Sequence, residues 1–261
     1  MRNSYNSRYP SRKDNRGLRQ VQTPRNLDGR FGRGTAPFVV RQDYFARFPL
    51  RACDDGSCGC VIYLSGKEVD HPRIGLMLSY NGAGYRKKKR PRWAADNGCF
   101  TQPQKYSDQG YLKWLDKFDR SGCFFATAPD VVGDADETLK RSKPMLPKIK
   151  ELGYRTAFVA QDGATVDKMP WRDFDCLFVG GTNKFKLCQA AAECMREAKQ
   201  RGKSVHMGRV NSYKRIRLAK FLGADSVDGT YITFGPKKNC RNVLGWLQRL
   251  DSEPMLKMAI G

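Results

Sequence analysis

Short apolar segments alternate with amphipathic segments along the chain from about residue 60 onward. The apolar segments predict buried β-strands at residues 61–64, 74–80, 92–95, 123–127, 156–160, 176–179, 204–207 and 226–227. Between them, apolar residues at helical spacing predict helices at residues 111–118, 137–152, 186–200 and 211–222. Gly153, Gly202 and Gly223 follow three of these segments, as expected where helices end.

This alternation is typical of a parallel α/β protein. About eight strands favour a closed (β/α)8 barrel of the TIM type over an open doubly wound sheet, although periodicity alone leaves both open. Only about 190 residues remain to build it, so we expect a compact barrel in which helices are short or missing. Pro144 and Pro147 predict a break within the helix at 137–152.

The N-terminal segment has a different composition from the rest of the chain. It is rich in arginine and has few apolar residues to bury. We therefore predict two parts, a basic flexible arm at residues 1–40, disordered until it meets a partner, and an α/β-barrel domain at residues 41–261.

Positive charge dominates the whole chain, with 48 Lys and Arg against 26 Asp and Glu and a formal net charge of +22. Such an excess of positive charge strengthens binding to nucleic acid, because counterions are released from the phosphate backbone. The alternatives are a role in solubility, or binding to an acidic protein or a membrane surface. A second basic run follows a glycine-bearing stretch and predicts an exposed nucleic-acid-binding loop, or alternatively a merely solvated one. Its basic residues are Arg86, Lys87, Lys88, Lys89, Arg90 and Arg92.

Neither a membrane span nor a secretory signal is expected. No segment approaches the roughly 18 apolar residues that cross a bilayer, and the N-terminus is polar and arginine-rich. Most of the nine cysteines lie in apolar segments, where reduced thiols pack as small hydrophobic groups. We expect a cytoplasmic protein without a disulfide scaffold.

Polar residues and glycines follow the predicted strands one after another. In a barrel these positions share one rim, where close carboxylates repel each other and cost stability unless function uses them. A single aspartate after a strand is usually a turn or helix-cap residue, but several on one rim favour catalysis. The candidates are Asp96, Asn97, Asp130, Gln161, Gly180, Gly181, Gly208 and Asp228.

Several of these segments resemble the queuine-type guanine transglycosylases. Residues 96–100, D-N-G-C-F, resemble the family's D-S-G-G-F signature. Residues 206–208, H-M-G, and 223–229, G-A-D-S-V-D-G, resemble its M-G…G-x-D-x-F-D-C segment in order and spacing. Residues 129–130, 159–163 and 179–181 resemble its base-recognising strand ends, so that the similarity covers roughly residues 74–235.

This resemblance implies a base exchange at C1′ of a nucleotide. Asp228 would be the nucleophile and Asp96 would handle protons on the departing and entering bases. Asp130, Gln161 and Gly180 would recognise the base, with further contacts from Asn97, Gly181, His206 and Gly208. Two displacements through a covalent intermediate suit paired carboxylates and require no cofactor. Asp225 and Asp134 are the rivals of Asp228 as nucleophile.

Two departures from the tRNA-acting enzymes bear on the substrate. Asn97 and Cys99 replace the serine and second glycine of the first signature, and only Cys240 lies where the family's C-x-C-x-x-C…H zinc site is expected. With the basic arm, this favours the branch that inserts 7-deazaguanine bases into DNA, often carried by phages; such a protein would work in the host cytoplasm. The partners would be DNA, with tRNA as the alternative, and a free 7-deazaguanine base, while the oligomeric state stays open.

One further cluster is a candidate structural zinc site. It consists of Cys53, Cys58, Cys60 and His71. These are suitable zinc ligands, but their spacing is not a standard one, and reduced thiols in a turn with His71 as a turn cap are the alternative. His206 lies in an apolar strand and is predicted to be structural rather than a general base.

Two other classes of function remain open. A barrel that kept its basic segments could bind nucleic acid without catalysis, or a glycosylase could let water resolve the intermediate and leave an abasic site. Asp96, Asp130 and Asp228 together favour the exchange enzyme.

Overall fold

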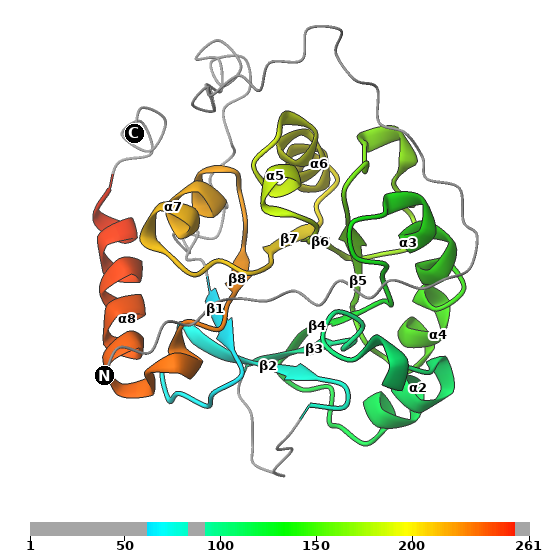
Figure 1. Cartoon of the computed structure of the whole chain (residues 1–261), viewed down its shortest axis with the longest axis horizontal. Helices are drawn as coiled ribbons and strands as arrows, with labels where there is room; N and C mark the ends of the chain where they lie inside the picture. Colours follow the sequence, from blue (N-terminus) through cyan, green and yellow to red (C-terminus); the bar gives the residue numbers. More distant parts are fainter. Residues whose placement is uncertain (1–61, 83–91, 254–261) are drawn as a thin grey trace, which may run out of the picture. The chain divides into compact units, whose positions relative to one another are not determined.

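Eight parallel strands close into a barrel in the computed structural model, which describes residues 62–82 and 92–253 (Figure 1). Each strand pairs with the next along the chain, and β1 pairs with β8 to close the ring. The strands are β1 (Ile62–Ser65), β2 (Ile74–Ser79), β3 (Trp93–Asp96), β4 (Cys123–Thr127), β5 (Thr156–Ala160), β6 (Cys176–Val179), β7 (Ser204–Met207) and β8 (Ser226–Asp228). The predicted (β/α)8 barrel is confirmed, and the open sheet is excluded.

Helices surround the strands but do not follow every one (Figure 1). Residues 66–73 join β1 to β2 without a helix, and only the 3-10 turn η2 (Val166–Lys168) lies between β5 and β6. The helices are therefore short or missing, as predicted. They are α2 (Asp108–Asp116), α3 (Ala135–Ser142), α4 (Leu146–Glu151), α5 (Asn183–Lys186), α6 (Gln189–Gln200), α7 (Tyr213–Phe221) and α8 (Pro236–Ser252), with the 3-10 turns η1 (Pro103–Lys105) and η3 (Ile232–Phe234).

Helix boundaries follow local backbone chemistry. The predicted helix 137–152 is two helices, and Pro147 lies in the first turn of α4, where its missing N–H costs no hydrogen bond. Gly153, Gly202 and Gly223 have φ values of 82°, 69° and 87°, the left-handed conformation that ends a helix. The predicted helix 186–200 corresponds to α6, which begins three residues later than predicted, and the short helix α5 lies before it.

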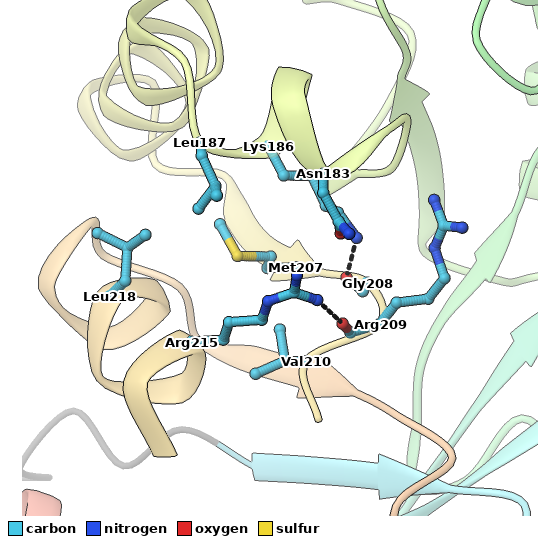
Figure 2. Close-up of a pocket in the computed structure, with 9 residues that line it drawn as sticks. All are labelled: Asn183, Lys186, Leu187, Met207, Gly208, Arg209, Val210, Arg215 and Leu218. Atoms are coloured by element: carbon cyan, nitrogen blue, oxygen red, sulfur yellow. Dashed lines mark hydrogen bonds between the residues drawn. The ribbon is translucent and has the colours of Figure 1, made fainter. Parts of the chain in front are cut away.

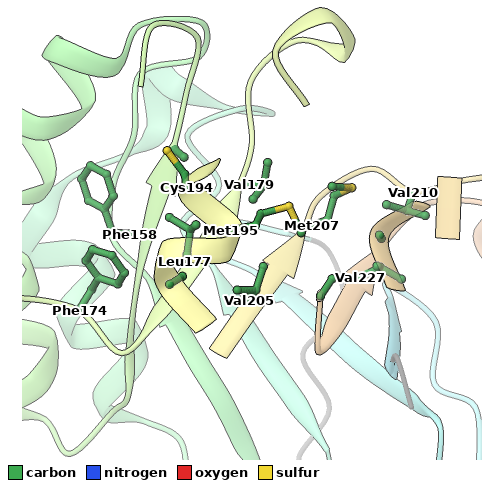
Figure 3. Packing of buried hydrophobic residues seen from close by; sticks show 14 of the residues in the cluster. Phe158, Phe174, Leu177, Val179, Cys194, Met195, Val205, Met207, Val210 and Val227 are labelled. Atoms are coloured by element: carbon green, nitrogen blue, oxygen red, sulfur yellow. The ribbon is translucent and has the colours of Figure 1, made fainter. Parts of the chain in front are cut away.

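Two apolar layers hold the barrel together. The inner layer takes Leu64, Ala94, Phe125, Ala157 and Cys176 from five different strands. The outer layer packs strands against helices, for example where Leu177, Val179 and Val205 meet Cys194 and Met195 of α6 (Figure 3). Because side chains alternate between these layers along each strand, every second strand residue points into the barrel.

Several predicted features lie outside the described residues. These are the arm at 1–40 and its boundary with the barrel domain, Cys53, Cys58 and Cys60, and the basic residues Arg86, Lys87, Lys88, Lys89 and Arg90. Among the described helices, none has the length and apolar character that a membrane crossing requires.

Candidate active site

The carboxyl ends of the strands bring the candidate polar residues to one end of the barrel. Asp96 is the last residue of β3 and Asp228 the last of β8. Each lies two positions after a residue of the barrel interior, Ala94 or the buried Ser226, so each carboxylate points toward the barrel axis. Such positions carry the catalytic residues of TIM barrels.

Asp96 lies in an environment that favours its protonated form. Its Oδ2 accepts a hydrogen bond from Ser79 Oγ at 3.0 Å. Burial, together with the charges of Asp130 and Asp228, outweighs this bond and raises the pKa of Asp96 from 3.8 to about 6. A carboxyl group with this pKa can both donate and accept a proton near neutral pH.

Asp130 follows β4 and is held by two carboxamides. Asn97 Nδ2 donates to Asp130 Oδ1 at 2.8 Å and to Ala128 O at 2.8 Å, and Gln161 Nε2 donates to Asp130 Oδ2. Burial raises the pKa of Asp130, while these bonds act in the opposite direction. All three side chains are buried, so the carboxylate has a fixed orientation.

Asp228 keeps 20% of its side chain exposed. Its Oδ1 accepts a hydrogen bond from the backbone N–H of Arg209, in the loop after β7. Its Oδ2 lies 4.0 Å from His206 Nε2. One oxygen is thus held by the protein while the group remains reachable from outside.

His206 lies below Asp228, inside the barrel, rather than at the open rim. Its ring has no exposed surface, packs against Phe125 and Phe178 with centroid separations of 5.0 and 4.5 Å, and places Nδ1 2.8 Å from Ser226 Oγ. Nε2 has no hydrogen-bond partner among the described residues. His206 can therefore act on a substrate only through Asp228, and not by direct contact in this arrangement.

Both rivals of Asp228 have structural roles. Asp225 precedes β8, at the opposite end of the strand, where it binds Lys199 Nζ at 2.7 Å and accepts a hydrogen bond from Val205 N at 2.7 Å. Asp134 caps α3 by accepting a hydrogen bond from Glu137 N at 2.9 Å. Asp225 cannot reach the mouth that contains Asp96, and Asp134 is an ordinary N-cap.

The candidate glycines allow close approach of the backbone. A Cβ on Gly180 would lie 2.7 Å from Val159 Cγ1 and 3.1 Å from Gln161 Nε2, so a side chain there would displace the amide that orients Asp130. A Cβ on Gly208 would lie 2.7 Å from the Phe178 ring. Gly181 is buried beside them.

Two residues at this end, Arg209 and Lys186, were not assigned a role from the sequence. Arg209 has a left-handed backbone conformation, with φ 57°. Its side chain donates a hydrogen bond to Gly181 O and lies over the Phe100 ring, with its guanidinium carbon 4.8 Å from the ring centroid. Lys186 is buried. The position of Arg209 after a strand end was a usable signal, whereas nothing in the local sequence distinguishes Lys186 from an exposed lysine.

Two other sequence candidates lie away from the mouth. Arg92 directly precedes β3, at the amino-terminal end of the strands, so it does not reach the mouth. His71 Nδ1 accepts a hydrogen bond from Arg73 N at 3.1 Å, the turn-capping arrangement. Across residues 62–82 and 92–253, no group of three His, Cys, Asp or Glu side chains could hold a metal ion.

Comparisons with known proteins give only similarities to solved structures. No family model matches the sequence, and no curated protein matches it. Two structures of tryptophan synthase from M. tuberculosis, an aminoacrylate- and BRD0059-bound form and an open form with BRD0059, align with 14% and 15% identity and TM-scores of 0.42 and 0.36. The alignments cover 62% and 65% of this chain and 62% of each matched chain.

Tryptophan synthase subunit alpha from Legionella pneumophila str. Paris aligns over 76% of this chain and 91% of its own, with 8% identity and a TM-score of 0.34. Similarities at this level concern the chain path and carry no conclusion about activity.

Proposed function

We propose that the protein is a guanine transglycosylase that exchanges a guanine base of DNA for a free 7-deazaguanine base. The observation that carries the proposal is the pair of strand-end carboxylates in one mouth with different surroundings. Asp96 is held where burial raises its pKa to about 6, while Asp228 keeps 20% of its side chain exposed. Unequal carboxylates of this kind divide the roles of proton donor and nucleophile in glycosidic chemistry.

The exchange takes two displacements at C1′. In the first, an Asp228 oxygen bonds to C1′ as the bond from C1′ to N9 of guanine breaks, and Asp96 gives its proton to the departing base. In the second, N9 of the incoming base bonds to C1′, the bond to Asp228 breaks, and Asp96 takes up the proton that the incoming base loses. The configuration at C1′ is retained, and Asp96 ends protonated as it began.

The position and partners of Asp130 support a role in recognising the base. Its carboxylate is fixed by Asn97 and Gln161, and it lies close enough to Asp96 to affect that residue's pKa. A fixed carboxylate can accept hydrogen bonds from N1–H and the 2-amino group of guanine. A 7-deazaguanine presents the same edge, so one site accepts both the leaving and the entering base.

DNA is the proposed polynucleotide because of charge and access. The net charge of +22 favours a phosphate backbone, and the resemblance to the DNA-acting branch points the same way. A base stacked in a duplex cannot present both C1′ and its polar edge to a barrel mouth, so the target nucleotide would be flipped out.

Trapping of the intermediate tests the mechanism. Full-length protein is incubated with a guanine-containing DNA strand, a matched RNA strand or tRNA, without an incoming base, and separated on a denaturing gel. We expect an adduct with the wild type on DNA, its loss in Asp228→Asn, and its retention in Asp134→Asn. The control makes the same chemical change at a helix cap, where asparagine serves as well as aspartate.

Adding labelled guanine or a 7-deazaguanine then shows exchange into the strand. An adduct that persists in Asp228→Asn would refute the assigned nucleophile. Abasic sites would indicate a glycosylase, adduct on tRNA alone would change the substrate, and binding without adduct or exchange would indicate a noncatalytic protein.

A further inference from the structure

Exposed apolar side chains occur at the mouth end of the barrel. In the part of the chain that the structure describes, three large hydrophobic side chains are exposed, Phe100, Val132 and Phe234. They follow β3, β4 and β8, so all three lie at the carboxyl end of the strands, which also carries Asp96 and Asp228. Scattered singly over the molecule they would need no explanation, whereas their restriction to one end indicates a surface that meets a partner.

Phe234 is the most exposed of the three, at 83%, and it is near the proposed nucleophile along the chain. It is the sixth residue after Asp228, which limits the distance between them to about 20 Å even in extended chain. Its 3-10 turn η3 also lies near the end of β1, since a Cβ placed on Gly66 would be 3.9 Å from Thr233 Oγ1. The turn therefore forms the part of the rim beside β1 and β8.

The turn η3 is anchored to the rest of the fold, so Phe234 has a fixed position on the rim. Ile232, two residues earlier, is fully buried. Asn239 Nδ2 donates to Tyr231 O at 2.8 Å, and the Tyr231 ring stacks on Trp246 of α8 with 5.0 Å between the ring centroids. An aromatic ring on such a support loses little conformational entropy when it binds a partner.

Helix α8 adds positive charge directly after this turn. Lys237, Lys238 and Arg241 are exposed, and their spacing of three and four residues places them on one helix face. None of the three forms an ion pair with a described carboxylate. Like charges at this spacing repel each other, and lysines in the first turn oppose the helix dipole, so helix stability does not account for them. An anionic partner at this rim would compensate these charges.

A further exposed cation, Arg209, lies on the loop after β7. Figure 2 shows its side chain directed away from Arg215 and α7, and it lies over the Phe100 ring, which brings its charge to the mouth. The rim thus combines exposed aromatic rings with cations. Polynucleotides are anionic and their bases stack on aromatic side chains, so this combination fits a nucleic acid better than an acidic protein.

We propose that Phe234 inserts into the base stack of duplex DNA, in the space that the flipped target nucleotide leaves, while Lys237, Lys238 and Arg241 bind the adjacent phosphates. The inference rests on the proposed function for the flipped nucleotide. A planar ring has about the thickness of one base step, about 3.4 Å, and apolar side chains inserted between base steps hold DNA in a distorted conformation. Phe234 would act on the DNA stack and not on C1′, which makes it a positioning residue.

Comparison of duplex and single-stranded DNA tests this inference. The full-length chain carrying Asp228→Asn, which is expected to form no adduct, is titrated with a strand that contains a single guanine beside a 2-aminopurine, either paired or unpaired. We expect Phe234→Ala to weaken duplex binding about tenfold and to abolish the rise in 2-aminopurine fluorescence, because the stacking of one ring is lost. Binding of the unpaired strand should not change, since it has no gap to fill. Phe234→Tyr should restore both signals.

Matched variants separate stacking from charge and from loss of structure. Thr233→Ala changes an exposed residue of the same turn and should leave both affinities unchanged. Lys237→Gln with Lys238→Gln should weaken duplex binding and reduce the slope of log affinity against log salt by about 2. Lys148→Gln with Lys150→Gln makes the same change at exposed positions of α4 and should not. Because Phe234 is exposed, Phe234→Ala should keep the thermal stability of the parent chain.

The outcomes separate this inference from the proposed reaction. Unchanged duplex affinity in Phe234→Ala, or equal weakening for the paired and unpaired strands, would overturn the insertion. A dimer of the parent chain that Phe234→Ala dissociates would overturn it as well and assign the rim to a second copy of the protein. A selective loss of duplex binding and of the fluorescence rise, in a protein whose wild type forms no adduct and exchanges no base, would support the insertion while refuting the transglycosylase.

Discussion

Asp96 should destabilise the folded protein at neutral pH, and Asp96→Asn should reveal by how much. The pKa of Asp96 is about 6 in the folded protein against 3.8 for an exposed aspartate. At 1.36 kcal/mol per pKa unit, this difference corresponds to about 3 kcal/mol. Asparagine removes the charge and retains an oxygen that can accept the hydrogen bond from Ser79.

The sign follows from proton binding. Between about pH 4 and pH 6 the folded protein keeps a proton on Asp96 that the unfolded chain has lost, so the free energy of unfolding falls as pH rises through this window. Below the window the wild type and Asp96→Asn are both neutral at this position. Above it, only the wild type has a partly buried carboxylate there.

Urea unfolding of both proteins at about pH 4 and about pH 7.5 measures the effect. We expect the stability of Asp96→Asn relative to the wild type to increase by about 2 kcal/mol between the two pH values, because an exposed aspartate is already more than half ionised at pH 4. A fixed packing difference between the two side chains cancels in this comparison. Asp116→Asn is the control, because its carboxylate is 64% exposed and its ion pair with Arg120 contributes little.

A relative stability that does not change with pH would refute the account of Asp96. A change in the opposite direction, with the wild type gaining at high pH, would mean that hydrogen bonds outweigh burial, and Asp96 would then be unsuited to donate a proton.

Two further predictions separate structural from functional charges. Asp225→Asn should lower the free energy of unfolding by about 1 kcal/mol, because it weakens the contacts with Lys199 and Val205. Base exchange per folded molecule should stay at the wild-type level. Urea unfolding and an exchange assay on the same preparation measure both effects. Deleting residues 1–37 should weaken DNA binding and reduce its dependence on salt, because the arm is rich in arginine; equal affinity and salt slope in both proteins would exclude the arm as a binding element.

The hydrophobic pattern located the strands, and their number, about eight, favoured the barrel over an open sheet. Four of the eight strands, β4 to β7, begin and end at the predicted residues, because each is a short buried run with a clear polar boundary. Helix α8 was missed, although Val243, Leu247 and Leu250 are buried at helical spacing. Helix α5 was also missed, and α6 was predicted to begin three residues early, because no proline or glycine separates the two helices.

The candidate site, like the fold, was predictable from the sequence only in part. Strand direction alone distinguishes Asp228, at the carboxyl end of β8, from Asp225 at its amino end. Hydrogen bonds between distant segments could not be read from the sequence: Asn97 and Gln161 meet on Asp130 only because β3, β4 and β5 are neighbours. The burial of Lys186 likewise depends on the packing of α5 against the loop after β7.

Strand β8 is only three residues long, and the carboxylates of Asp225 and Asp228 form hydrogen bonds at its beginning and its end. Asp225 ties its beginning to Lys199 and Val205, and Asp228 receives the backbone N–H of Arg209 at its end. Closure of the barrel and the proposed chemistry thus depend on different residues of the same short segment. Loss of the Asp228 carboxylate should therefore leave the barrel closed, because the contacts of Asp225 remain.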